Sequence, residues 1–478
     1  MKTALKKTKI VATIGPATES EEMLTKLIQE GLNVIRLNFS HGDFAEHQLK
    51  LDNARKAAKK LGARVAILQD LSGPKIRIGD FYQDRVQLKK GSTFTLKTEK
   101  ITGNEQEAYV NYPTLPEEVS KGQIIMLDDG KKQLEVTKVG KGFVETKVLV
   151  GGDTKGRRGV NIPGANLSIS ALTEKDKKDI AFGVKNDVEF FALSFVRRVG
   201  DIEELRAILK RKKCDAHIIA KIETQEAVDN FEEILTAVDG VMVARGDLAI
   251  EVPAEKVPLI QKRIIALANA AGKPVITATQ MLESMIHSPV PTRAEVSDVA
   301  NAIYDGTDAV MLSEETTLGE YPLEAVKVMA RVAKETEESF FDGVATNETN
   351  EMDLEGVPVT DSVTASVVNT ANEVNAKTIV ALTDSGLTAR MISRYRPKMP
   401  ILALSGSEKT CNRLALSFGC FPEKVERFGD LKNALEVVRR ECVNQKLASR
   451  GDKVIVSAGV PFHEKQSVKT NMLVVLEI

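Results

Sequence analysis

Short apolar runs alternate with amphipathic segments before Gly73, and the same alternation resumes at about Ser168. Each pair of run and segment is typical of the strand–helix unit of a parallel sheet. The amphipathic segments with clear bounds predict helices at 20–31, 44–61, 200–211, 259–271 and 322–340, with another that starts near 292. The pattern predicts an α/β fold with a (β/α)8 TIM barrel of eight units, whose apolar runs are KIVATIG, NVIRLNFSHG, RVAILQDLSGPKIR, VEFFALSFVR, HIIAKIE, GVMVARGD, KPVITATQ and DAVMLSEET.

Two further regions depart from this alternation. Between the third and fourth units the chain changes to short β segments with turns, including the hairpin signal LDDGKK, which predicts an inserted all-β domain. A polar, acidic stretch then predicts a linker, and KTIVALT, PILALS, KVIVSAG and MLVVLEI predict an open α/β sheet after it. The predicted division is 1–72 with 168–340 for the barrel, 73–167 for the insert, 341–360 for the linker and 361–478 for the C-terminal α/β domain.

Polar residues follow nearly every apolar run of the predicted barrel, as in TIGP, RLNFSHG, QDLSGPK, SFVR, KIE, RGD, TATQ and SEET. A single polar end only marks where a strand stops. Eight at the same end of the strands favour an active site, because catalytic groups of such barrels lie at the carboxyl ends of the strands.

The stretch from His217 to Glu251 carries the most concentrated chemistry. Lys221 and Glu223 are two residues apart on one strand and therefore share a face. Asp247 ends the next strand, so the two carboxylates and the lysine converge if these strands are neighbours. Such a group would hold Mg²⁺ and an anionic substrate. From these residues alone, a strand-end salt bridge with a helix-capping aspartate is an equally good interpretation.

Composition excludes several classes of protein. The 478 residues carry 66 Lys and Arg against 67 Asp and Glu, so no basic field favours nucleic acid. Four cysteines lie far apart without CxxC spacing, which argues against a disulfide framework or a zinc site. No run is long enough to span a membrane, and the N-terminus has no signal-peptide core, so we expect a cytoplasmic protein.

A second candidate site lies in the C-terminal domain, where Thr383 to Thr388 join a strand to a helix. Hydroxyls and backbone N–H groups at such a junction suit a phosphate. An ordinary N-cap turn is the better interpretation of this loop alone. The sequence contains no Walker A motif and no GxGxxG, so a nucleotide would not bind through those loops.

The strand ends together resemble the pyruvate kinase family. The resemblance rests on TIGPAT, RLNFSHG, DLSGPKIR, GVNIPG, LTEKDKKDI, KIE, MVARGDLAIE, ITATQMLESM, PTRAEVSDVANAIYDGTDAVMLS and GEYPLEAV. It implies a barrel with a lid inserted after the third strand and a C-terminal regulatory domain. It also implies the glycolytic transfer of a phosphoryl group from phosphoenolpyruvate to ADP, giving pyruvate and ATP, with Mg²⁺ as cofactor and Mn²⁺ as its substitute.

The resemblance implies roles for individual residues. Glu223 and Asp247 would coordinate the metal ion, Lys221 would stabilise the phosphoryl group, and Arg36 would hold it from a facing strand. The alternative for Arg36 is a surface ion pair. Thr279 would order a water relay that protonates the enolate, because its own pKa is wrong for a strong acid, or else it caps a helix. The substrate-binding set is Arg36, Lys221, Ala244, Arg245, Gly246, Asp247 and Thr279, in which the backbone N–H groups of Arg245 to Asp247 receive the carboxylate.

The resemblance also implies a nucleotide site and a monovalent-cation region. The nucleotide contacts would be Pro16, Asn38, His41, Arg77 and Arg158. Many members bind K⁺ through groups matching Asn38, Ser40, Asp70 and a following threonine, with a nearby glutamate in GPEIR. Here Leu71 follows Asp70 and the motif reads GPKIR, so we hypothesise that the Lys75 ammonium replaces K⁺.

Two residues depart from the family pattern. Ala249 stands where glycine is usual, next to the metal-binding loop, and Glu314 stands where glycine or alanine is usual. Glu314 either perturbs a neighbour or faces solvent.

Regulation and assembly follow from the resemblance only as expectations. Thr383, Ser385, Gly386 and Thr388 would bind a phosphorylated effector, a sugar phosphate or AMP, although the loop GVPFHEKQSVKTNM lacks the usual glycine-rich form. A homotetramer is expected. Two rival functions remain, a metal-dependent lyase of pyruvate enolate, which needs no ADP, and a phospho-ligand sensor without turnover.

Overall fold

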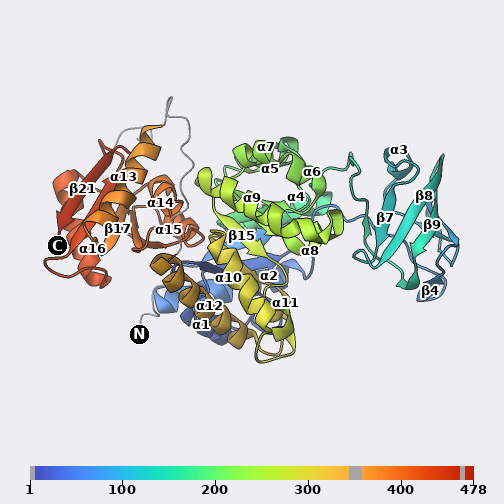
Figure 1. The fold of residues 1–478 in the computed structure, drawn as a ribbon, viewed down its shortest axis with the longest axis horizontal. Coiled ribbons are helices and arrows are strands. Elements are labelled where there is room, and N and C mark those ends of the chain that lie inside the picture. The colour runs from blue at the N-terminus through green and yellow to red at the C-terminus, as the bar shows by residue number, and fades with distance from the viewer. Residues whose placement is uncertain (1–5, 344–357, 463–468) are drawn as a thin grey trace.

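The computed structural model describes residues 6–343, 358–462 and 469–478. Three parts follow one another along its long axis, with the C-terminal domain at one end, the barrel in the middle and the inserted domain at the other end (Figure 1). Most of the predicted linker 341–360 lies outside the described residues. No helix in the described ranges combines the length and apolar character needed to cross a bilayer.

The barrel is closed by parallel strands in the order β1-β16-β15-β14-β13-β12-β3-β2, which confirms the predicted fold class. Apolar side chains fill both its interior and the space between strands and helices. In the described residues its strands are β1 (Lys9–Thr13), β2 (Val34–Asn38), β3 (Ala66–Asp70), β12 (Phe190–Leu193), β13 (His217–Ile222), β14 (Gly240–Ala244), β15 (Val275–Ala278) and β16 (Ala309–Leu312).

The barrel helices begin where the sequence offers caps. The side chains of Ser20, Asp43 and Thr292 accept hydrogen bonds from backbone N–H groups of the first turn, and Gly62 ends its helix in the left-handed region at φ 60°. One predicted helix is broken at Asn230 into two shorter ones. The helices are α1 (Glu21–Gln29), α2 (Phe44–Leu61), α4 (Glu174–Lys185), α5 (Val199–Arg211), α6 (Gln225–Asp229), α7 (Phe231–Ala237), α8 (Arg245–Glu251), α9 (Val257–Ala270), α10 (Arg293–Tyr304), α11 (Glu314–Thr317) and α12 (Pro322–Gly343), with 3-10 turns η1 (Ala254–Lys256) and η2 (Glu283–Ile286).

The inserted domain leaves the barrel after β3 and returns before α4. Its sheets have the orders β11-β7-β8-β9-β5-β6 and β10-β4, around an apolar core of its own. The predicted hairpin is confirmed, because β7 pairs antiparallel with β8. The elements are β4 (Arg85–Leu88), β5 (Thr93–Lys97), β6 (Glu107–Tyr109), α3 (Leu115–Glu118), β7 (Ile124–Leu127), β8 (Lys132–Gly140), β9 (Phe143–Val150), β10 (Gly152–Lys155) and β11 (Val160–Asn161). We call this domain the lid.

The C-terminal domain is an open sheet in the order β19-β18-β17-β20-β21, parallel except for β21. Its elements are α13 (Val359–Glu373), β17 (Thr378–Leu382), α14 (Leu387–Ser393), β18 (Ile401–Ser405), α15 (Glu408–Leu414), β19 (Cys420–Lys424), α16 (Leu431–Asn444), β20 (Lys453–Ala458) and β21 (Met472–Glu477). Ala415 and Leu416 join the core cluster of the barrel interior, so this domain closes the amino-terminal end of the barrel, which we call the floor.

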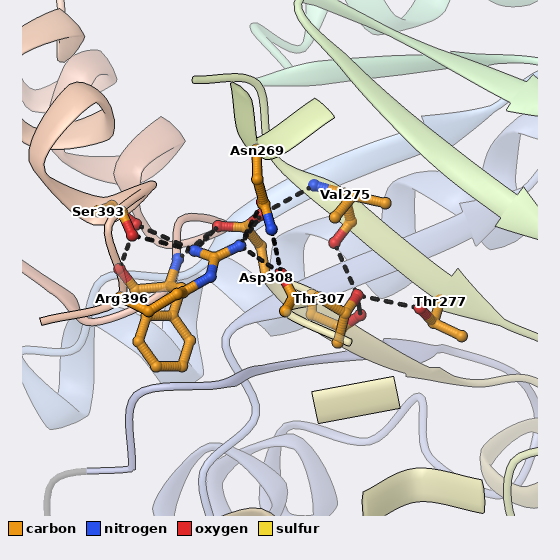
Figure 2. Close-up of polar contacts among 10 residues, drawn as sticks. Asn269, Val275, Thr277, Thr307, Asp308, Ser393 and Arg396 are labelled. Atoms are coloured by element: carbon orange, nitrogen blue, oxygen red, sulfur yellow. Dashed lines mark hydrogen bonds and ion pairs between the residues drawn. The ribbon is translucent and has the colours of Figure 1, made fainter. Parts of the chain in front are cut away.

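Four side chains at the floor repeat one device. Asn33, Glu189, Asp239 and Asp308 each precede a barrel strand and accept a hydrogen bond, at 2.8–3.0 Å, from a backbone N–H near the start of the neighbouring strand. Two of them also reach the C-terminal domain, where Glu189 accepts from Asn412 and Asp308 pairs with Arg396 (Figure 2). All four side chains therefore fix the starts of neighbouring barrel strands, and Glu189 and Asp308 also hold the interface with the C-terminal domain.

Candidate active site

Lys221 lies at the centre of a buried polar cluster at the carboxyl end of β13. Its ammonium is 2.8 Å from Glu223 Oε1 and 3.4 Å from Asp70 Oδ1, and it donates to Ser194 Oγ at 2.7 Å. The pairing of β13 with β12 and β14 brings these groups together. Burial alone would lower the pKa of Lys221, but Asp70 and Glu223 outweigh it and raise that pKa above its ordinary value. The ammonium therefore stays charged.

Arg36 faces this cluster from β2. Its Nε donates to Asp70 Oδ2 at 2.7 Å and its Nη1 to Thr13 Oγ1 at 2.8 Å. The Arg36 side chain is 11% exposed and that of Asp70 only 1%, so the pair is not a surface ion pair. Burial would raise the pKa of Asp70, but Lys221 and Arg36 lower it below its ordinary value. Two fixed cations thus share one buried carboxylate.

Glu223 and Asp247 are the two carboxylates predicted to hold a divalent metal ion. Oε2 of Glu223 accepts from the Phe195 N–H at 2.8 Å, and its Oε1 lies 2.8 Å from the Lys221 ammonium. Burial raises the pKa of Glu223 and the nearby Asp247 carboxylate raises it further, against the opposing effect of Lys221. A divalent cation would offset the repulsion between the Glu223 and Asp247 carboxylates, so the two side chains fit a pair of ligands for such an ion. The described residues contain no group of three or more metal-ligating side chains, so other ligands would come from substrate and water.

Helix α8 and Thr279 form the adjoining wall. Asp247 lies in the first turn of α8, directly after β14. Thr279 has a left-handed φ of 70°, and its Oγ1 accepts from the Gly246 N–H at 2.7 Å and donates to the Ala278 carbonyl at 2.6 Å. Thr279 therefore caps the amino-terminal end of α8. A left-handed φ is also strained for a threonine, and such backbone strain is typical of functional sites.

Arg245 holds this wall in place. It donates to the Thr279 carbonyl at 2.7 Å and forms an ion pair with Asp298 of α10 at 2.7 Å. The segment from Ala244 to Asp247 is thus tied to β15 and α10 as well as to its own strand.

A cleft of about 820 Å³ opens between this wall and the lid. Asp247 lines it from the barrel, Lys75 and Arg77 from the connection into the lid, and Arg158 from the lid itself, where its Nε lies 3.3 Å from Asp128 Oδ1. Partial desolvation lowers the pKa of Lys75, and the positive charges of Arg77 and Lys221 lower it further. The carboxylates of Asp247 and Glu223 oppose this shift. Six Lys and Arg side chains and six carboxylates line the cleft, so its lining mixes the two signs of charge.

The remaining residues of the predicted nucleotide and cation regions lie near the same strand ends. Partial burial lowers the pKa of His41, and Lys75, Arg77 and Arg36 lower it further. Asn38 Oδ1 accepts from the Ser40 N–H at 3.1 Å, and the Leu71 side chain is buried. Pro16 is exposed after β1.

Some side chains of the site carried no signal of their own in the sequence. Ser194 begins SFVR and Thr13 begins TIGP, two segments that only marked strand ends. Their hydroxyls matter because they contact Lys221 and Arg36, and only the strand register places them there.

The two departures from the family pattern both lie at the surface. Ala249 is exposed on α8 and Glu314 is exposed in α11, so the question about Glu314 resolves to a side chain that faces solvent.

In the C-terminal loop, Thr383 Oγ1 accepts from the Gly386 N–H at 2.9 Å, and Gly386 has a φ of 84°. Thr388 Oγ1 is hydrogen-bonded to Thr470 Oγ1 at 2.8 Å, and the Ser385 hydroxyl accepts a long 3.4 Å bond from Leu387 N–H. The side chains of this turn thus accept hydrogen bonds from its own backbone, as in an ordinary N-cap turn. Binding of an effector here stays a prediction. Part of the second predicted loop, 463–468, lies outside the described residues.

Comparison with known proteins settles the family. Residues 5–326 match the family described as pyruvate kinase, barrel domain, and residues 361–476 match pyruvate kinase, alpha/beta domain. The chain belongs to the pyruvate kinase family. Pyruvate kinase from Geobacillus stearothermophilus is 47% identical over 472 residues, which cover 98% of this chain and 80% of the relative. Pyruvate kinase from Sporosarcina psychrophila is 45% identical over 463 residues, with 96% and 79% covered.

The fold agrees with solved pyruvate kinases. The crystal structure of a pyruvate kinase from Cryptosporidium parvum superposes with a TM-score of 0.91 at 36% identity, covering 99% of this chain and 96% of that one. The predicted family and architecture are therefore confirmed, and the pyruvate kinase family uses a divalent metal ion.

Proposed function

We propose that the cluster around Lys221 transfers the phosphoryl group of phosphoenolpyruvate to ADP, giving pyruvate and ATP, the glycolytic reaction of the family (EC 2.7.1.40). Membership of the family along nearly the whole chain supports the activity. The observation that carries it to particular residues is the buried Lys221 ammonium, which lies between Glu223 and Asp70 beside the first turn of α8.

Phosphoryl transfer needs positioning and charge neutralisation more than covalent help. In the proposal, Lys221 and Arg36 contact the phosphoryl group from two sides, because both cations are buried and held by Asp70. Glu223 and Asp247 bind Mg²⁺, or Mn²⁺ in its place. The metal ion, when bound, neutralises charge on the phosphate and carboxylate of the substrate.

The α8 wall would bind the substrate carboxylate. Backbone N–H groups at the start of a helix favour an anion, and Ala244, Arg245 and Asp247 stand there. The Gly246 N–H is already taken by Thr279 Oγ1, so its contribution to carboxylate binding requires that this bond open. Thr279 would order a water that protonates the enolate carbon, since a threonine hydroxyl is too weak an acid itself.

The nucleotide would bind in the cleft under the lid. Arg77 and Arg158 would neutralise the diphosphate, and Pro16, Asn38 and His41 would contact the nucleotide from the barrel rim. The support for Arg77 and Arg158 is that both line the cleft together with Asp247. Pro16, Asn38 and His41 rest on the family resemblance.

We further propose that K⁺ is not required, because Lys75 supplies the charge. Both oxygens of Asp70 already contact Arg36, Lys221 and Ser194, Asn38 Oδ1 accepts from the Ser40 backbone, and Leu71 has no side-chain ligand. The oxygens of Asp70 and Asn38 that would bind a monovalent cation thus already contact protein groups.

Assembly as a homotetramer and binding of a sugar phosphate or AMP at Thr383, Ser385, Gly386 and Thr388 are also proposed, on the family resemblance alone. Sedimentation velocity and titration of the full chain with each ligand test them.

The decisive experiment is pyruvate release from saturating phosphoenolpyruvate and ADP with Mg²⁺ in K⁺-free buffer. Turnover that depends on ADP supports the kinase and excludes the lyase. Absence of turnover with or without K⁺ would contradict the proposed function.

A further inference from the structure

The lid touches the barrel at the last turn of α8. Asn161, at the end of β11, donates from Nδ2 to Glu251 Oε1 at 3.2 Å, and Glu251 is the final residue of α8. The lid hairpin lies against the same turn, because a Cβ placed on Gly130 would lie 3.7 Å from Ile250 Cγ2. Since β11 pairs with β7, whose hairpin contains Gly130, both contacts belong to one edge of the lid.

The opposite end of α8 carries the proposed substrate and metal contacts. The helix spans only Arg245–Glu251, about two turns, so a shift of its last turn is transmitted to Asp247 in its first. The first turn is held by the Gly246–Thr279 hydrogen bond and the Arg245–Asp298 ion pair, whereas the last turn receives the lid.

Glu251 is suited to a specific contact. It is partly buried, and it lines the cleft together with Asn161. Burial raises its pKa, and the Asn161 amide and Arg197 oppose that rise. If Asn161 moved away, Glu251 Oε1 would lose its amide donor while still partly shielded from water. The loss of that hydrogen bond costs free energy, so it favours the position of the lid edge in which Asn161 contacts Glu251.

We propose that Asn161 and Glu251 are positioning residues that couple the lid to α8, so that seating of the lid edge orients Asp247 and the carboxylate-binding turn. The inference rests on the proposed function of α8 and assigns a role to Asn161 of GVNIPG and Glu251 of RGDLAIE, beyond the proposed catalytic and binding residues. Neither side chain is expected to contact the reacting atoms.

The test uses the direction of the hydrogen bond, in which Asn161 is the donor and Glu251 the acceptor. Asn161→Asp places a carboxylate against Glu251, which should raise KM for phosphoenolpyruvate and lower kcat/KM about tenfold, because a partly buried acceptor pair is left unsatisfied. Glu251→Gln keeps an acceptor for Asn161 and should stay within about threefold of wild type. The double variant restores the bond in reverse, because the new amide on α8 donates to the new carboxylate on β11, and it should recover to within about threefold.

A matched control and a second readout separate the outcomes. Asn104→Asp makes the same charge change in the lid, away from α8, and should leave KM unchanged. Hydrogen exchange of the α8 amides, measured without substrates, should quicken in Asn161→Asp and return in the double variant. An unaltered KM in Asn161→Asp, or no recovery in the double variant, would overturn the coupling. An inactive wild type would overturn only the proposed function, since the exchange measurement still reports the contact.

Discussion

Arg396 of the C-terminal domain and Asp308 at the barrel floor form a bidentate ion pair, with Nη1–Oδ1 at 3.1 Å and Nη2–Oδ2 at 3.0 Å (Figure 2). The side chains are 9% and 5% exposed. Asp308 also accepts from the Phe418 and Val275 N–H groups, so one carboxylate joins two barrel strands to the neighbouring domain.

Asp308→Ala should lower the free energy of unfolding by about 3–5 kcal/mol, because it leaves a buried guanidinium without its counter-charge and two backbone donors without a partner. The midpoint of urea unfolding, followed by circular dichroism, measures the loss. Glu22→Ala removes an exposed ion pair with Lys26 and should leave the midpoint nearly unchanged. Equal shifts in both variants would contradict the special role of the floor pair.

Lys221→Met should lower kcat by about a thousandfold, because a fixed cation beside the transferring group is lost while the buried stem still packs. Steady-state kinetics with phosphoenolpyruvate and ADP measure it. Lys210→Met, on the exposed last turn of α5, serves as control and should keep wild-type kcat. A Lys221→Met enzyme with more than a tenth of wild-type kcat would rule out the assigned role.

Glu223→Gln should weaken metal binding at least tenfold, because an amide replaces a charged ligand. Mn²⁺ binding by titration calorimetry in the presence of phosphoenolpyruvate measures this without turnover. Glu232→Gln, an exposed change on α7, is the control and should bind Mn²⁺ like wild type. Unchanged Mn²⁺ affinity in Glu223→Gln would place the metal ion elsewhere.

Lys75→Glu should create a K⁺ requirement, because the variant lacks the ammonium and adds a carboxylate beside the site. Activity in K⁺-free buffer should fall at least tenfold and return with KCl but not with tetramethylammonium chloride. Lys89→Glu, in the lid away from the cleft, should remain indifferent to K⁺. Wild-type enzyme that itself needs K⁺ would refute the substitution of Lys75 for the ion.

His47 should make stability depend on pH. Burial lowers its pKa from 6.5 to about 4 in the folded state, where its ring stacks on Phe39. Between these values the unfolded chain binds the extra proton, so stability is complete above pH 6.5 and falls by about 1.4 kcal/mol per unit as pH drops toward 4. His47→Phe should remove one proton from the uptake on unfolding, measured as the slope of urea midpoint against pH. An unchanged slope would show that His47 does not titrate there.

Local patterns in the sequence were enough to predict the barrel, because apolar runs and helical periodicity report burial directly. The helix at 44–61 was predicted with its observed bounds, since Asp43 and Gly62 supply a cap and a stop. The KIE spacing likewise placed Lys221 and Glu223 on one face, and their 2.8 Å contact confirms it.

Tertiary structure decided which of these groups meet. The pairing of β2 with β3 brings Arg36 to Asp70, and the pairing of β12 with β13 brings Ser194 to Lys221, although the partners are 34 and 27 residues apart. The hydroxyl groups of Ser194 and Thr13 could not be assigned to the site from the sequence, because their role depends on contacts with Lys221 and Arg36 from other strands.

The contacts between the domains were also not predictable from the sequence. No local pattern of the sequence pairs Asn161 with Glu251 or Asp308 with Arg396. The elements, the eight-strand barrel and the residue types at the strand ends were predictable from the sequence, because the periodicity of apolar residues is a local property. The way the lid and the C-terminal domain join the two ends of the barrel is visible only in the folded chain, because those contacts depend on packing between segments far apart in the sequence.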